Sequence, residues 1–176
     1  MAFAAKSLYL VFFVSLIFSF VVLTQQSSIQ QNVTLQSSYD CVYTVYTKTG
    51  TKIGAGTDSN ISLALYDSYG NHIVILNLEK WGGLMGPKHD YFENGNLDIF
   101  SNLGGCLKGP VCAITLASDG TGSQSSWYVE DLQVTTTGPR IPCAQKLFTI
   151  EQWLDLDTSL SVTKNLCANV TSLASM

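Results

Sequence analysis

Short segments that alternate apolar and polar residues follow one another from Cys41 to Thr137, with glycine- and aspartate-rich turns between them. In the clearest example, residues 56–70, a turn leads into Ile61, Leu63 and Leu65 on one face, and a second turn follows. Because successive side chains of a strand point to opposite faces, each such run predicts a half-buried strand. Strands separated by turns about every ten residues favour an antiparallel β-sandwich, which carries its binding residues on loops.

Six strands and one ambiguous segment make up the expected sandwich of about seven strands. Residues 81–87 are expected to form a glycine-rich loop, and the apolar cluster at 147–154 fits either a strand or a helix. The expected strands span residues 41–48, 60–67, 72–78, 96–100, 112–117 and 126–136.

The start of the chain differs from the rest. Residues 1–24 carry Lys6 as their only charge, followed by an apolar run from Leu8 to Leu23, which predicts a cleaved secretory signal peptide. A membrane anchor is the alternative, but this run is shorter than the roughly 20 residues that a spanning helix needs. We expect a flexible polar leader over 25–40, a domain with a C-terminal extension over 41–168, and a tail over 169–176.

Sequons and cysteines also indicate the secretory pathway. Asn32, Asn60 and Asn169 each begin an acceptor triplet for N-glycosylation.

All five cysteines follow the predicted signal, and in an oxidising compartment most of them would be bridged. Cys106 and Cys112 are close in sequence and flank a Gly-Pro turn, so a local bridge between them is plausible. Of Cys41, Cys143 and Cys167, two are then expected to tie the ends of the domain together, and one is left free.

The charge excludes some partners. The formal net charge is -4, only 12% of the residues are charged, and lysines and arginines do not cluster. Binding to nucleic acid requires phosphate neutralisation, and purely electrostatic attraction to anionic lipid requires a polybasic patch. We therefore expect no nucleic-acid partner, and membrane contact only through apolar loops or a bridging cation.

Several segments together resemble a known family. They are YTVYT at 43–47, GTD at 56–58, LEKWGGLMGP at 78–87, YFENGNLDIF at 91–100, SWYV at 126–129 and EQWL at 151–154. The sequence from Cys41 to about Cys167 resembles the PLAT domain, also called LH2, and in particular the small plant secretory proteins that consist of one such domain.

The resemblance implies an eight-stranded sandwich with no enzyme attached. In larger relatives the domain is a targeting module whose loops bind calcium in some members and insert aromatic side chains into membranes. The stand-alone plant proteins are embryo-specific or stress-induced and often associated with the endoplasmic reticulum. The resemblance therefore implies a lipid or membrane surface, or another protein, as the partner.

Apolar side chains on the loop at 81–87 are candidates for lipid contact. Trp81, Leu84 and Met85 lie among glycines and a proline, without the periodicity of a packed element. Tryptophan suits the boundary between lipid headgroups and acyl chains. The alternative is that Trp81 closes one end of the sandwich, since large aromatic side chains are usually buried.

Acidic residues at turns are candidates for a calcium site, since Ca²⁺ takes several carboxylate and carbonyl oxygens. Asp58 occupies the Gly-Thr-Asp position of the resemblance, and Glu93 and Asp98 lie near the next matching loop. Asp58 could instead bond its own turn backbone. A glycan on Asn60 would also project close to Asp58, so the two uses of this loop compete.

A catalytic site receives little support from the sequence. His72 opens an apolar stretch and His89 precedes Asp90, but no Gly-x-Ser-x-Gly elbow or zinc-ligand spacing occurs. We predict a non-catalytic binding module. The alternatives are a protein-interaction partner without lipid affinity, and a small secreted hydrolase that uses His89, Asp90 and a nearby serine.

Overall fold

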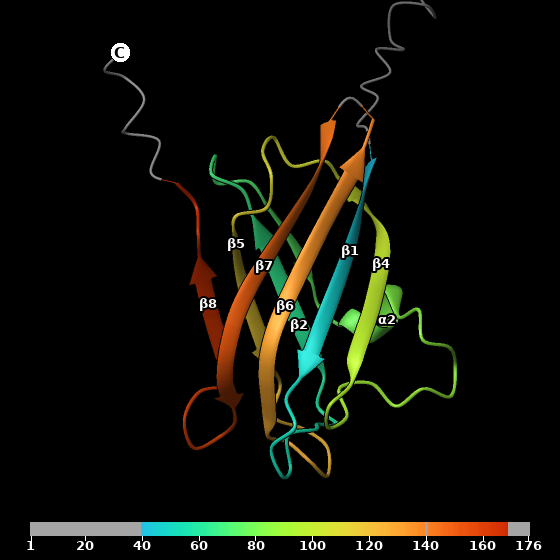
Figure 1. Cartoon of the computed structure of the whole chain (residues 1–176), viewed down its shortest axis with the longest axis vertical. Helices are drawn as coiled ribbons and strands as arrows, with labels where there is room; N and C mark the ends of the chain where they lie inside the picture. Colours follow the sequence, from blue (N-terminus) through green and yellow to red (C-terminus); the bar gives the residue numbers. More distant parts are fainter. Residues whose placement is uncertain (1–39, 140, 169–176) are drawn as a thin grey trace, which may run out of the picture. The chain divides into compact units, whose positions relative to one another are not determined.

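The computed structural model describes residues 40–139 and 141–168. The predicted signal peptide, residues 25–39 of the predicted leader, the tail 169–176 and the sequons at Asn32 and Asn169 lie outside the described residues. Two antiparallel sheets of four strands each face one another across a common apolar core (Figure 1). The predicted antiparallel β-sandwich is confirmed, with eight strands.

The strand order is β4-β1-β6-β7 in one sheet and β3-β2-β5-β8 in the other. The first sheet contains β4 (Leu97–Gly105), β1 (Asp40–Thr49), β6 (Trp127–Gly138) and β7 (Ile141–Leu154). The second contains β3 (His72–Ile75), β2 (Ile61–Tyr66), β5 (Ala113–Ser118) and β8 (Ser161–Asn165). Both sheets therefore mix strands from early and late parts of the chain.

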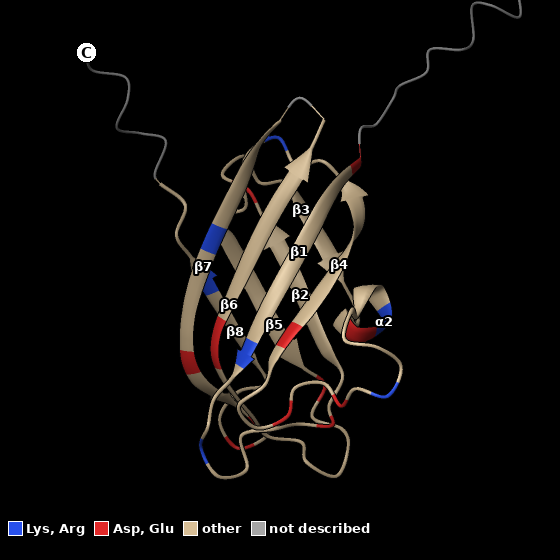
Figure 2. Cartoon of the chain, turned by 45° about the vertical axis from the view of Figure 1, so that its right-hand side comes forward, with Lys and Arg blue, Asp and Glu red and all other residues tan. Residues whose placement is uncertain are grey.

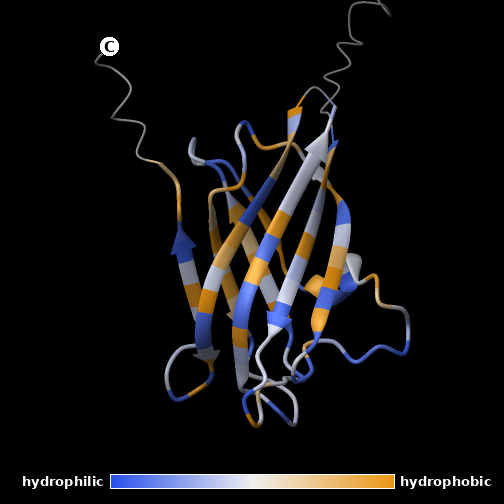
Figure 3. Cartoon of the chain, in the orientation of Figure 1, coloured by the Kyte–Doolittle hydropathy of each residue, from blue (hydrophilic) through white to orange (hydrophobic). Residues whose placement is uncertain are grey.

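Alternating burial along the strands builds the core, as the sequence predicts. In β2, Ile61, Leu63 and Leu65 are buried, and in β1 Tyr43 and Val45 are buried. Figure 3 shows the strands banded with hydrophilic and hydrophobic residues, which reflects this alternation. One face of each sheet is thus removed from water, and this burial is the main stabilising term of the fold.

Two expected boundaries are wrong. The strand expected at 72–78 ends at Ile75, and α2 (Leu78–Gly82) follows it, so the expected loop begins with helix. Asn77 caps this helix, because its Oδ1 accepts a hydrogen bond of 2.7 Å from the Lys80 amide. The segment 78–82 is thereby held as one helical turn, and no helix in the described residues is long and apolar enough to cross a membrane.

The ambiguous cluster at 147–154 is a strand. It forms the second half of β7, in which Phe148 and Ile150 are buried, and it pairs with β6. The strand interpretation is therefore correct, because Phe148 and Ile150 are two residues apart and both face the core.

The disulfides differ from the expected local bridge. Cys41 is bonded to Cys106, with Cα atoms 4.9 Å apart, and Cys112 to Cys167, with Cα atoms 4.7 Å apart. Cys106 follows β4, which pairs with β1, and Cys112 precedes β5, which pairs with β8. Neighbouring strands of one sheet thus bring each pair together, and Cys143 is the free, exposed cysteine.

At the end of the sandwich that carries the disulfides, one carboxylate holds two loops together. Asp67 accepts hydrogen bonds from the amides of Tyr69 and Asn71, both at 2.9 Å, and from the Asn71 side chain at 2.8 Å. It also accepts bonds from the amides of Lys108 and Gly109, at 3.1 and 3.2 Å. The β2–β3 turn and the β4–β5 loop are therefore fixed to one another.

We expect opposite stability changes from replacing two buried threonines of β1 by valine. Among residues 40–139 and 141–168, the buried Thr47 hydroxyl has no hydrogen-bond partner, whereas Thr49 Oγ1 accepts a bond of 2.9 Å from Trp127 Nε1. Thr47→Val should raise the free energy of unfolding by about 1 kcal/mol, and Thr49→Val should lower it by about 1–3 kcal/mol because it orphans the indole. Denaturant titration of both variants checks this, and a loss of stability in Thr47→Val would contradict it.

Asp67 should also make stability depend on pH. Burial raises the pKa of Asp67, but hydrogen bonds from Asn71, Tyr69 and Gly109 outweigh burial, so the pKa lies below its ordinary value. The stabilisation is therefore present above about pH 4, the value of an unfolded aspartate, and is lost as the pH falls through the lower folded value. Acid unfolding of wild type should be steeper than that of Asp67→Asn, and parallel curves would refute the assignment.

Candidate functional site

Three loops meet at the other end of the sandwich, at the bottom of Figure 1. The β1–β2 loop donates from the Thr57 amide to Phe92 O, at 3.2 Å, and from the Asp58 amide to Gln124 O, at 3.0 Å. The Gly95 amide donates in turn to Gly50 O, at 3.0 Å. The β1–β2 loop is thus tied by its backbone to the segment before β4 and to the β5–β6 loop.

These loops gather three carboxylates. One oxygen from each of Asp58, Asp90 and Glu93 lies within 4.8 Å of the others. Figure 2 shows that acidic residues are concentrated at this end of the sandwich. We call the three residues the acidic cluster. Carboxylates at this spacing repel one another, and a divalent cation would relieve that repulsion.

Two glycines allow the loops to approach so closely. A Cβ on Gly122 would lie 2.6 Å from Asp58 Cβ, and the φ of Gly122 is +89°, a conformation that favours glycine. A Cβ on Gly56 would lie 3.0 Å from the Asn94 nitrogen and 3.1 Å from Glu93 Oε2. Side chains at these two positions would push the acidic residues apart.

The Asp58 carboxylate is held in place by the β5–β6 loop. Its Oδ2 accepts hydrogen bonds from the Ser123 hydroxyl and, at 3.1 Å, from the Gln124 amide. These bonds, chiefly the one from Ser123, hold the pKa of Asp58 below its ordinary value. Asp58 is therefore ionised and oriented before any ligand arrives.

Asp98 does not join the acidic cluster, although the sequence places it among the candidate ligands. Its side chain is fully buried, because Asp98 and Phe100 occupy inner positions of β4 while Leu97 lies on the outer face. The carboxylate contacts His89 Nε2 at 2.6 Å and accepts from the Phe92 amide at 2.7 Å. Asp98 thus anchors the loop, and Asp90 takes its place in the cluster.

Phe92 fixes the loop between Asp90 and Glu93. Its φ is 61°, an uncommon value for a residue with a side chain. Its ring stacks on Phe100, with centroids 5.4 Å apart, and meets the edge of Trp127 at 5.2 Å. Packing in the core therefore holds a backbone conformation that places the two flanking carboxylates outside.

The lipid-contact candidates separate into two groups. Trp81 is half-buried and packs against the core, whereas Leu84 and Met85 are 60% and 40% exposed. The sequence reasoning did not single out Ile53 and Leu156, which lie on other loops and are 100% and 69% exposed. In the sequence, each of the two is only an isolated apolar residue in a polar turn, and such a residue is a weak indication of lipid contact.

The remaining candidates take structural positions. His89 binds the buried Asp98, so the histidine and aspartate that pair are not the neighbours His89 and Asp90. His72 lies at the exposed edge of β3 and contacts the Tyr66 ring. Asn60 is exposed at the start of β2, and its side chain accepts from Asn77 Nδ2, so glycosylation there remains a prediction.

Comparison with known proteins decides the family. The family model described as Embryo-specific protein 3 (ATS3) matches residues 28–148. PLAT domain-containing protein 2 of Arabidopsis thaliana is 53% identical over 131 residues, 73% of this chain and 72% of that protein. The chain belongs to the embryo-specific protein 3 family of PLAT-domain proteins. PLAT domain-containing protein 3 of the same plant is 58% identical over 100 residues, 56% of this chain and 96% of that protein.

Larger proteins contain similar PLAT domains. Lipoxygenase homology domain-containing protein 1 of Homo sapiens is 32% identical over 117 residues, which cover 64% of this chain and 5% of that protein. The crystal structure of coral 8R-lipoxygenase superposes with a TM-score of 0.52 and 25% identity, over 69% of this chain and 16% of the lipoxygenase. The PLAT fold of this chain is thus found as one module of much longer proteins.

Proposed function

We propose that this PLAT-domain protein is a non-catalytic module that binds a lipid or membrane surface through its loops. The observation that carries the proposal is the combination, on connected loops, of exposed apolar side chains and the acidic cluster. Leu84 and Met85 lie on the segment that runs from α2 to Asp90, and Ile53 lies on the loop that contains Asp58. Exposed apolar side chains on loops gain free energy when they leave water.

Calcium would connect the two features. Ca²⁺ takes six to eight oxygens, so Asp58, Asp90 and Glu93 would supply part of a shell that carbonyls, water or a lipid phosphate completes. Support comes from coral 8R-lipoxygenase, whose structure is described in terms of calcium activation via a C2-like domain. The bound cation would offset two of the cluster's three negative charges and so weaken the repulsion between this end and an anionic membrane.

The proposal includes an oxidising compartment. The two disulfides are typical of proteins of the secretory pathway, either lumenal or extracellular. Together with the predicted signal peptide and the family resemblance, they favour a role in the endoplasmic reticulum or apoplast, connected with stress response. Fractionation of plant tissue that expresses the full chain with a C-terminal epitope would test this placement, and a cytosolic protein would contradict it.

Replacing the exposed loop residues should weaken membrane binding. Leu84→Ser combined with Met85→Ser removes apolar surface worth about 1.5 kcal/mol or more if both side chains become buried, which corresponds to about a tenfold loss of affinity. Co-sedimentation with phosphatidylcholine–phosphatidylserine vesicles, with calcium present, measures the change. The matched control is Val74→Ser with Leu76→Ser, since these residues are also exposed but lie at β3. Equal losses in both double variants would exclude a specific role for the loop.

Calcium should stabilise the wild-type fold through the acidic cluster. A ligand at a hundred times its dissociation constant stabilises the folded state by about 2.7 kcal/mol, which should raise Tm by several degrees. Asp58→Asn with Glu93→Gln should remove this rise, whereas Asp157→Asn, a charge change in the β7–β8 loop, should leave it intact. Differential scanning fluorimetry in millimolar calcium and in EDTA provides the measurement. An unchanged wild-type Tm would contradict calcium binding at the acidic cluster, and the vesicle experiment alone would then test membrane binding.

A protein partner without lipid affinity is the alternative that these experiments separate. In that case neither the Leu84/Met85 variant nor calcium would change sedimentation, because wild type itself would stay in the supernatant at all vesicle compositions.

A further inference from the structure

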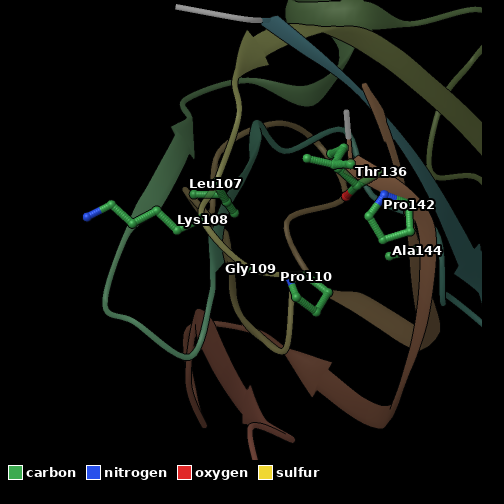
Figure 4. A pocket seen from close by; sticks show the side chains of 8 residues that line it. Leu107, Lys108, Gly109, Pro110, Thr136, Pro142 and Ala144 are labelled. Atoms are coloured by element: carbon green, nitrogen blue, oxygen red, sulfur yellow. The ribbon is translucent and has the colours of Figure 1, made fainter. Parts of the chain in front are cut away.

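A groove opens at the disulfide-bearing end of the sandwich, opposite the acidic cluster. A cavity of about 160 Å³ lies between the β4–β5 loop and the β6–β7 pair, and a second of about 220 Å³ adjoins it. The two share Pro110, Thr136 and Ala144 as lining residues, so they form one groove along the inner side of β7. Figure 4 shows Leu107 and Pro110 on one side and Thr136, Pro142 and Ala144 on the other.

The lining is mainly apolar, and its polar side chains are those of Thr136, Gln145, Lys108 and Lys146. Its apolar residues include Leu107, Pro110, Ile141 and Pro142 in the first cavity and Val111 and Val134 in the second. Thr136, only 5% exposed, contributes its side chain from β6. A mainly apolar groove suits a hydrocarbon chain better than a sugar or a peptide.

The walls of the groove are fixed rather than loose. Leu107 N donates to the Tyr43 hydroxyl at 3.1 Å, and that hydroxyl donates to Gly105 O at 3.1 Å. The Asp67 carboxylate holds the amides of Lys108 and Gly109. With the Cys41–Cys106 and Cys112–Cys167 bonds on either side, the β4–β5 loop is held in an open shape before any ligand arrives.

A lysine without a carboxylate partner lines the groove. Lys146 is half-buried and occupies an inner position of β7, two residues before the buried Phe148. Between residues 40 and 168, leaving out residue 140, the one ion pair is His89–Asp98, so no acidic side chain neutralises Lys146.

Lys164 also falls at an inner position, on β8, two residues after the buried Val162. By contrast, Figure 4 shows the Lys108 ammonium pointing away from the groove.

The wider charge distribution favours an anion at this end. Figure 2 shows the acidic residues mainly at the opposite end. Of the acids near the groove, Asp67 already accepts five hydrogen bonds from its neighbouring loops. Lys146 lines a mainly apolar groove, so a ligand carboxylate that reaches its ammonium group would gain a charge-assisted hydrogen bond there.

From these features we infer that the groove binds a single-chain aliphatic monocarboxylate, with its hydrocarbon chain between the β4–β5 loop and β7 and its carboxylate on Lys146. The site is separate from the loops proposed to contact membranes, and it needs no calcium.

Titration calorimetry with sodium octanoate, in EDTA and without vesicles, tests this inference on the disulfide-bonded protein. Wild type should bind octanoate saturably and more tightly than octan-1-ol. Lys146→Gln, alone and with Lys164→Gln, should weaken octanoate binding about tenfold, the loss expected for one charge-assisted hydrogen bond, and leave octan-1-ol unchanged. Lys80→Gln, an exposed lysine of α2, is the control of equal charge.

A filling variant tests the groove itself. Ala144→Phe should abolish binding of both octanoate and octan-1-ol, because its ring would occupy the shared part of the two cavities. Thermal unfolding confirms that each variant is folded before it is titrated. Absence of saturable octanoate binding to wild type, or equal affinity in the Lys146→Gln/Lys164→Gln variant, would overturn the inference. Neither result would affect the vesicle experiments, which concern the opposite end.

Discussion

The packing of two sheets through their inner faces positions every loop of this protein. Trp127, fully buried at the start of β6, shows how this works. Its indole donates to Thr49 at the end of β1, and its ring meets Phe92 in the loop before β4. One core side chain thus connects two strands and a loop. Because interiors are packed to crystal-like density, such a loop cannot shift without disturbing the core.

The same packing explains why a carboxylate lies inside the apolar core. Asp98 sits at an inner position of β4, where it binds His89 and the Phe92 amide rather than solvent. Burial of a charged group is costly unless it is hydrogen-bonded, so these contacts hold the loop strongly. Their effect on the surface is indirect: Asp90 and Glu93 face outward on either side of an anchored Phe92.

Much of the fold follows from the sequence, but the site follows only in part. The period-two alternation predicts β1, β2, β5 and β6 because their inner positions are consistently apolar. It fails at Leu78, which continues the apolar run of the strand expected at 72–78 but begins a helix that Asn77 caps. Asp98, a candidate ligand from the sequence, lies outside the acidic cluster, because a sequence shows that an acid is near a loop but not which face of the strand it occupies. The Cys41–Cys106 pairing depended on strand order, which joins residues far apart in sequence.

Each disulfide secures a strand at the margin of its sheet: β4 through Cys106 and β8 through Cys167. Reduction would leave the ends of both strands held by hydrogen bonds alone, and a frayed margin exposes unpaired amide and carbonyl groups to other chains. Protein produced in a reducing cytosol is therefore at risk of edge-to-edge aggregation even though its core sequence is unchanged. Recombinant production should use an oxidising compartment or oxidative refolding. The solubility of the product then depends on correct formation of the two disulfides as much as on amino-acid composition.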